Sequence, residues 1–189
     1  SDLTFITNEK NKQLKQRIAE LIKNSKEVRF LVGFFYFSGI DELYEALKNN
    51  PSVQVDVLVG LNTDKTIHGL IEYPDPNVNI TDRERVEKFF DSIAKSINSD
   101  EFDTKEFYER VKYYLSLIKS GKLIIRKTLK PHHDKLYVFN MKDELRTLKK
   151  SVLITGSSNL TRAGLSTQNE FNVEISDHGT QEANDYFEK

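Results

Sequence analysis

Two strand-like apolar segments separated by a short amphipathic one constrain the fold of this chain more than any other feature. The first, VRFLVGFFYF (28–37), is largely aromatic and β-branched, which is typical of a central strand buried on both faces. The second, VQVDVLVG (53–60), places a valine at every other position, so its valines share one face. Between them, SGIDELYEALKNNP has helical spacing, with Ser38 before it and Pro51 stopping it. Strand, helix and strand in succession predict an α/β layered fold.

The rest of the chain continues this alternation. A polar loop is expected over 61–80, acidic helices near 82–97 and 104–119, and a C-terminal helix from about Gly179. An N-terminal helix capped by Asn8 is predicted from four apolar residues at helical spacing: Leu14, Ile18, Leu21 and Ile22. Four more strands are predicted within 121–129, 135–140, 151–157 and 169–175. We therefore expect a mixed sheet flanked by helices, with no internal repeat.

Composition narrows the class of protein. A chain of 189 residues with 38% hydrophobic and 30% charged residues is expected to form one soluble domain, 1–189. Cysteine is absent, which excludes disulfides and thiolate metal sites and fits a cytoplasmic location. No apolar run approaches the roughly 18 residues of a membrane span. Because the sequence starts with Ser and stops inside a helical pattern, we expect a domain excised from a longer, multi-domain protein.

Charge is unevenly distributed although the net charge is only −1. Residues 119–150 hold ten Lys and Arg against three Asp and Glu, a local charge of +7. Residues 72–109 hold five against eleven, a local charge of −6. A basic block is the usual footprint of a phosphate-bearing partner, although a solvated lysine-rich surface has the same composition.

The stretch KPHHDKLYVFN (130–140) places polar side chains at the start of a strand. If the strand is regular, His133, Lys135 and Tyr137 point to one side and Asp134 to the other. Alone, such a histidine is more often solvated than catalytic. A later strand runs into TGSSN, where Ser157 and Asn159 follow Gly156, although GSSN alone is an ordinary turn composition.

Together these elements resemble the half-site motif of the phospholipase D superfamily, His-x-Lys followed by Gly-Ser-x-Asn. The similarity covers about residues 122–176 and is greatest to the bacterial DNA-acting branch, which includes restriction endonucleases and helicase-associated domains. It implies a phospholipase D-like layered fold with one motif copy per chain. It further implies a catalytic set of five residues: His133, Lys135, Ser157, Asn159 and Glu170.

One position departs from the family pattern. The aspartate five residues after the motif lysine is Asn140 here, which weakens a phospholipase assignment more than a nuclease one. The nuclease branch uses a later glutamate, which corresponds to Glu170, and Glu174 remains a possible substitute.

The resemblance implies a phosphodiesterase that needs no metal and no cofactor. A neutral imidazole of His133 attacks phosphorus, while Lys135 and the polar motif residues neutralise charge on the phosphate oxygens. Glu170 is expected to accept a hydrogen bond from His133 and so to fix its tautomer. Since the leaving group needs a second histidine as acid, one motif copy implies a homodimer with the site at the subunit interface.

Four cations are candidate nucleic-acid contacts, and they give affinity rather than sequence preference. They are Arg126, Lys127, Lys130 and Arg162. His132 and His68 are less favoured as site residues, because His132 is predicted to face away and His68 lies in the polar loop.

Three functions therefore compete at this stage. The first is a phosphodiesterase acting on DNA, as the nuclease-like N-terminal module of a helicase or restriction protein. The second is an inactive DNA-binding or dimerisation module of a helicase. The third is phospholipase or phosphatidyl transferase chemistry, which the single motif and the nuclease-like flanks disfavour.

Overall fold

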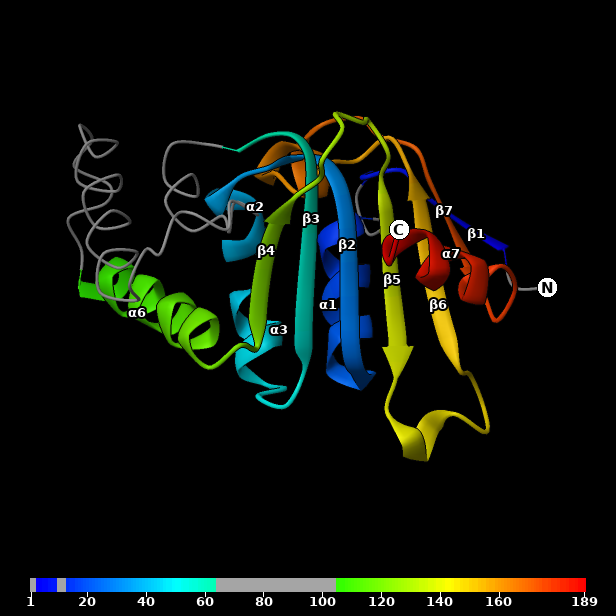
Figure 1. The fold of residues 1–189 in the computed structure, drawn as a ribbon, viewed down its shortest axis with the longest axis horizontal. Helices are drawn as coiled ribbons and strands as arrows, with labels where there is room; N and C mark the ends of the chain where they lie inside the picture. The colour runs from blue at the N-terminus through cyan, green and yellow to red at the C-terminus, as the bar shows by residue number, and fades with distance from the viewer. Residues whose placement is uncertain (1–2, 10–12, 64–104) are drawn as a thin grey trace.

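The computed structural model describes residues 3–9, 13–63 and 105–189, which form one seven-stranded sheet with helices on both faces (Figure 1). The strand order across the sheet is β1-β7-β6-β5-β2-β3-β4. The strands are β1 Leu3–Ile6, β2 Ser25–Phe35, β3 Gln54–Thr63, β4 Leu123–Lys127, β5 Leu136–Met141, β6 Ser151–Gly156 and β7 Asn172–Ser176.

The sheet is mixed, as the sequence predicts. Strands β2, β3 and β4 are parallel, whereas β1, β7, β6, β5 and β2 pair antiparallel in that order. Because of these directions, the ends of β2 and β6 and the starts of β5 and β7 lie on one edge of the sheet, the upper edge in Figure 1. The His-x-Lys segment before β5, the Gly-Ser-x-Asn loop after β6 and Glu170 before β7 therefore all lie at this edge.

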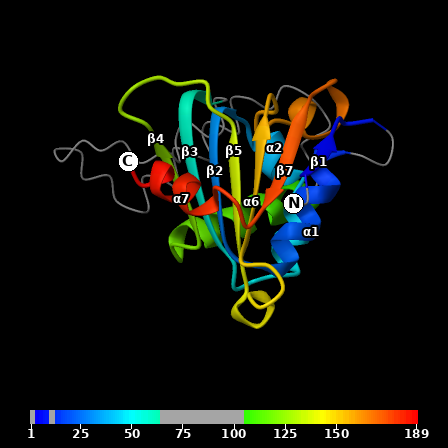
Figure 2. The same ribbon diagram turned by 90° about the vertical axis from the view of Figure 1, so that its right-hand side faces the viewer.

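The helices divide between the two faces of the sheet. In Figures 1 and 2, α7 lies on one face, and α1 and α3 lie on the other. The main hydrophobic core is on the α1 face, and a small cluster of Val138, Leu153 and Ala183 lies under α7. The α-helices are α1 Leu14–Asn24, α2 Phe37–Asp41, α3 Tyr44–Lys48, α6 Lys105–Lys119 and α7 Thr180–Phe187, with a π-helical turn at Ala163–Thr167.

The principal helix and strand predictions are confirmed. The N-cap position of α1 is Gln13 rather than the predicted Asn8, but the Asn8 side chain accepts a hydrogen bond from the Leu14 backbone N–H at 2.9 Å and so still satisfies the start of the helix. The central position of β2, between β5 and β3, agrees with its continuous apolar sequence. The predicted apolar faces of α1 and of the segment leading into β3 are buried: Leu14, Ile18, Leu21, Ile22, Val53, Val55, Val57 and Val59.

Three predictions of local structure were wrong or incomplete, and one strand was not predicted. The single helix expected after β2 is broken into α2 and α3, and Ser38 lies inside α2 because Tyr36 precedes its first turn. Gly39 packs so closely on the Leu160 carbonyl that an added Cβ would approach it to 2.2 Å, which fixes α2 to the loop after β6. The start of the predicted polar loop, 61–63, continues β3 by pairing with β2. Strand β1 was not predicted, and residue 135 precedes β5.

The acidic helix expected at 104–119 is α6. The rest of the polar loop and the helix expected near 82–97 lie outside the described residues.

Candidate active site

Gly33, near the end of β2, is the point where the two motif segments meet. A Cβ placed on Gly33 would lie 3.4 Å from Asn159 Oδ1 and 3.7 Å from His133 Cα. Asn159 Oδ1 also accepts a hydrogen bond from the Phe34 backbone N–H at 2.9 Å. A Cβ at these distances would make ordinary van der Waals contacts, so position 33 lies between the His-x-Lys segment and the Gly-Ser-x-Asn loop, and both segments are in reach of it.

The His-x-Lys segment is irregular, because β5 begins only at Leu136. Its alternation of sides nevertheless persists. The Tyr186 hydroxyl of α7 donates to Asp134 Oδ2 at 2.7 Å, whereas Tyr137 is buried in the core on the opposite face. His133 and Lys135 therefore flank a residue that is held on the α7 side. Within the described part of the chain, neither the His133 imidazole nor the Lys135 ammonium has a hydrogen-bond or ion-pair partner.

A shallow hollow of about 390 Å³ opens beside these two residues. Its other walls are the start of β5, the end of β6 and Tyr186 of α7. The lining residues are His133, Asp134, Lys135, Leu136, Thr155, Gly156 and Tyr186. A cation and an imidazole without partners, at the rim of an open hollow, are suited to bind an anion such as a phosphate group.

Ser157 and Glu170 are bonded to each other. The Ser157 hydroxyl donates to the Glu170 carboxylate and accepts from the Phe171 backbone N–H at 3.1 Å. The Ser157 N–H donates to the Phe171 carbonyl at 3.1 Å. The expected hydrogen bond between Glu170 and His133 is therefore not formed within this chain. Ser157 directly follows β6, whose end pairs with the start of β7. Its hydroxyl therefore lies beside the carboxylate of Glu170, which precedes β7.

Buried partners that the sequence reasoning missed hold the Gly-Ser-x-Asn loop. Ser158 and Asn172 are fully buried, and the Asn172 amide donates to Ser158 Oγ at 2.8 Å. The Tyr137 hydroxyl donates to the Ser158 carbonyl at 2.7 Å. Burial raises the pKa of Tyr137, and the negative charge of Glu170 raises it further, so this hydroxyl keeps its proton. The only sequence signal was the Glu-x-Asn spacing of Glu170 and Asn172.

Gly156 shows why the motif begins with glycine. A Cβ at this position would approach the Phe171 carbonyl to 2.2 Å and Asn172 Oδ1 to 2.6 Å. Any other residue would separate β6 from β7 at the point where Ser157 and Glu170 meet. The motif glycine is therefore required by the close contact of these two strands.

The candidate nucleic-acid contacts are not equivalent. Arg126 and Lys130 are exposed and Lys127 is half-buried, and none of the three forms an ion pair within the described ranges. Arg162 instead pairs with Glu42 at 3.1 Å, which compensates its charge. Arg126 and Lys127 lie on the edge strand β4, two strands beyond β2.

The other histidines take different places. The His132 backbone N–H donates to the Gly60 carbonyl at 3.3 Å, which sets this residue against β3. Its Nδ1 lies 3.5 Å from Asp134 Oδ2 but makes no hydrogen bond in the described part of the chain. His68 lies outside the described residues. Glu174, the possible substitute for Glu170, is buried and forms a two-point ion pair with Arg17 of α1 at 2.6 Å. That pairing identifies Glu174 as a structural residue.

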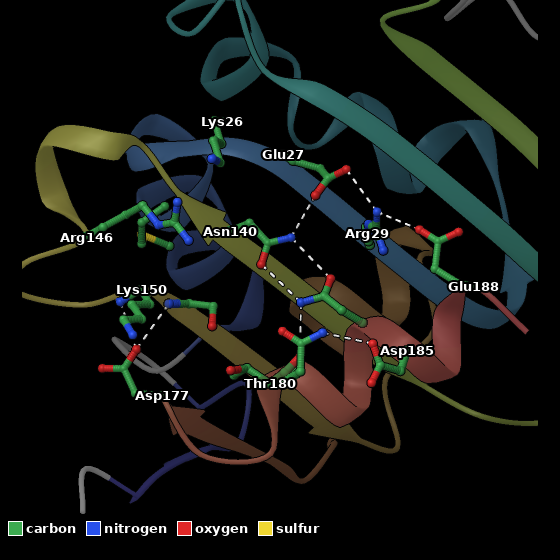
Figure 3. Close-up of a pocket in the computed structure, with 14 residues that line it drawn as sticks. Lys26, Glu27, Arg29, Asn140, Arg146, Lys150, Asp177, Thr180, Asp185 and Glu188 are labelled. Carbon is green, nitrogen blue, oxygen red and sulfur yellow. Dashed lines mark hydrogen bonds and ion pairs between the residues drawn. The ribbon is translucent and has the colours of Figure 1, made fainter.

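Asn140, at the far end of β5, joins the sheet to α7 (Figure 3). Its amide donates to Glu27 Oε2 at 2.7 Å and exchanges hydrogen bonds with the Asn184 amide at 3.2 Å. It lines a separate cavity of about 600 Å³ in which four cations and four carboxylates are mixed. The side chain at the family's aspartate position therefore stabilises the attachment of α7 and lies away from His133.

Within residues 3–9, 13–63 and 105–189, no group of three His, Asp or Glu side chains is arranged to hold a metal ion. No helix among the described elements is both long and apolar enough to cross a membrane.

Comparison with known proteins gives the family. The family model for "Cardiolipin synthase, PLD-like domain" matches residues 18–189. The curated proteins gave no match. Among solved structures, phosphatidylserine synthase from Haemophilus influenzae superimposes with a TM-score of 0.53 at 15% identity. That match covers 99% of this chain and 37% of the synthase, so the chain spans well under half of that protein.

Two other similar structures are matched over nearly their whole length. NucT from Helicobacter pylori has 14% identity and a TM-score of 0.47, with 99% of this chain and 93% of that one covered. Nuc from Salmonella typhimurium, described as a phospholipase D family member, has 15% identity and a TM-score of 0.45, with 99% and 90% covered. The synthase likeness agrees with the predicted fold, and the match over residues 18–189 shows that this chain belongs to the PLD-like domain family of the phospholipase D superfamily.

Proposed function

We propose that this chain is a metal-independent phosphodiesterase that acts on DNA through a phosphohistidine intermediate. The observation that carries the proposal is that His133 and Asn159 both lie beside Gly33. Lys135, two residues after His133, has no ion-pair partner among the described residues. The basic stretch 119–150, which includes Arg126 and Lys130, favours a polyanionic substrate. The parent protein would be a helicase or restriction protein that carries the chain as a nuclease-like module.

In the proposed first step, a neutral His133 attacks phosphorus, so that one P–N bond forms as the P–O bond to the leaving group breaks. The Lys135 ammonium and the Asn159 amide stabilise the negative charge on the non-bridging oxygens. The leaving oxygen takes a proton from His133 of the partner subunit, which enters this step as an imidazolium. Water then attacks phosphorus, so that a new P–O bond forms as the P–N bond to His133 breaks, and the partner's His133 takes the proton that the water loses.

Glu170 bonds to Ser157 rather than to His133 in this structure, and its part in catalysis stays a prediction. Because it accepts a hydrogen bond from Ser157, it fixes the direction of the serine hydroxyl and joins β6 to β7. The same observation favours the second candidate function, an inactive DNA-binding or dimerisation module, since His133 has no orienting carboxylate within the described part of its own chain.

The test is incubation of the purified chain with plasmid and single-stranded DNA in excess EDTA, beside His133→Ala. The matched control is His178→Ala, which removes an exposed imidazole from the turn before α7. We expect cleavage by the wild type and the control but not by His133→Ala. Sedimentation of the same samples measures whether the active form is a dimer.

Other outcomes identify the alternatives. DNA binding without cleavage by a folded dimer would support the binding module. Release of headgroup from phosphatidylcholine vesicles, without DNA cleavage, would support lipid chemistry. Cleavage that persists in His133→Ala would contradict the proposed nucleophile.

A further inference from the structure

One row of side chains on the α7 face leads from the hollow beside Lys135 to the outer edge of the sheet. Strand register places Leu136 opposite Thr155, Thr155 opposite Val173, and Val173 opposite Phe5. These residues share the α7 face, because their neighbours Tyr137, Ile154 and Ile6 are buried in the core on the other side. Two of the four, Leu136 and Thr155, line the hollow itself.

Helix α7 leaves this row uncovered over β6, β7 and β1. The helix packs on the next row of the same face, where Val138, Leu153 and Ile175 contact Ala183 or its neighbours. Thr155 and Phe5 are accordingly exposed, and Val173 is half-buried. The open row is thus a continuous strip of surface that begins at the candidate active site and ends at edge strand β1.

Two aromatic rings lie at the end of this strip. Phe5 and Phe171 have ring centroids 5.2 Å apart and remain 50% and 55% exposed. Phe171 is held firmly, because its backbone N–H and carbonyl both bond to Ser157 at 3.1 Å. The same residue therefore belongs to the polar network of the site through its backbone and presents a ring to solvent.

The size of this aromatic patch indicates what it binds. Two half-exposed phenyl groups offer roughly 200 Å² between them, since an aromatic side chain buries about 150–250 Å² when covered completely. A stable protein interface needs about 800 Å² on each partner. Exposed polar residues lie near both rings in the sequence: Thr4, Gln168 and Asn169. A patch of two rings fits a planar group better than a second subunit.

We propose that Phe5 and Phe171 form a stacking platform for the bases of a single-stranded nucleic acid whose phosphate lies at His133 and Lys135. This inference rests on the proposed function and adds a second point of contact to it. The strip crosses two to three strand spacings of about 4.8 Å between Leu136 and the rings. At the spacing of a stacked strand in B-DNA, about 3.4 Å per nucleotide, three to four nucleotides cover that distance, and a more extended single strand needs fewer. Stacking on aromatic rings is tolerant of sequence, so the platform selects unpaired bases rather than a sequence.

The test compares binding of two fluorescein-labelled hexamers by anisotropy, oligothymidylate and the same backbone built from abasic tetrahydrofuran units. His133→Ala is the background, so that cleavage does not interfere. We expect Phe171→Ala to weaken binding of oligothymidylate by roughly 5- to 150-fold and to leave the abasic hexamer unchanged. Phe171→Leu separates ring stacking from apolar volume, and it is expected to weaken oligothymidylate binding almost as much. Leu148→Ala, which trims an exposed leucine in the loop between β5 and β6, is the matched control.

The outcomes separate this inference from the proposed function. Equal loss for both hexamers, or a loss accompanied by a change from dimer to monomer, would overturn the platform and assign Phe171 to structure. Unchanged binding of oligothymidylate in Phe171→Ala would also overturn it, with the nuclease assignment intact. If neither hexamer binds the background protein and the wild type does not cleave DNA, the proposed function itself fails.

Discussion

The two ends of β5 carry two parts of one family motif, and their side chains are in opposite situations. Before the strand, His133 and Lys135 have no partner among the described residues and border an open hollow. At its other end, Asn140 bonds to both Glu27 and Asn184 under α7. Polar groups at a surface are solvated, so His133 and Lys135 can exchange water for a ligand, whereas the Asn140 amide already bonds to protein partners. The difference distinguishes positions suited to bind a ligand from positions that stabilise the fold.

Apart from loss of the nucleophile, substitution of Lys135 is expected to have the largest effect on activity. It tests whether the residues before β5 act in binding rather than in stability. Lys135→Met removes the cation and should lower the cleavage rate by about 10²- to 10³-fold, as loss of one charge-stabilising donor does. The free energy of unfolding should stay within about 0.5 kcal/mol of the wild type, because no partner is lost. Both quantities are measured by single-turnover cleavage and urea denaturation.

Lys23→Met is the matched control, since Lys23 is exposed at the end of α1, away from the site. Lys135→Arg keeps the charge and is expected to retain part of the activity. A large loss of stability in Lys135→Met would mean that the ammonium has a structural role, which would break the comparison.

The effect at the other end of β5 should fall on stability instead. Asn140→Asp restores the aspartate of the family pattern, but it places a carboxylate where the amide now lies 2.7 Å from Glu27 Oε2. Two carboxylates so close repel each other and raise their pKa, so the variant should lose about 1–3 kcal/mol of stability at neutral pH. The loss should shrink as pH falls and the pair takes up a proton.

Urea denaturation at pH 7 and pH 4.5 measures this change, with Asn184→Asp as a companion variant on α7. Cleavage per folded molecule should not change. A gain in cleavage of more than tenfold in Asn140→Asp would show that this position takes part in the chemistry after all.

The sequence predicted those features that depend on local pattern. Alternation along 133–138 was sufficient to place Tyr137 and Asp134 on opposite faces, and valine periodicity was sufficient for β3. The contacts between strands were not predictable in the same way. The bond between Glu170 and Ser157 depends on the register of β6 and β7, which the sequence does not state. The Ser158–Asn172 pair was missed for the same reason, because a serine in a turn gives no sign that it will be buried.

The smallest predicted effect concerns Tyr186, which joins the two regions by donating from α7 to Asp134, between His133 and Lys135. This bond raises the pKa of Tyr186, because ionisation would break it and place a second negative charge beside the carboxylate. A raised tyrosine pKa means that the bond contributes stability below pH 10, the usual pKa of tyrosine, and loses that contribution as pH rises through the higher folded value. Since Tyr186 is half-exposed, Tyr186→Phe should cost no more than about 0.5 kcal/mol at neutral pH. The difference from the wild type, measured by urea denaturation from pH 7 to pH 11, should disappear at the alkaline end. A constant difference over that range would show that the ring, rather than its hydroxyl, attaches α7 to the His-x-Lys segment.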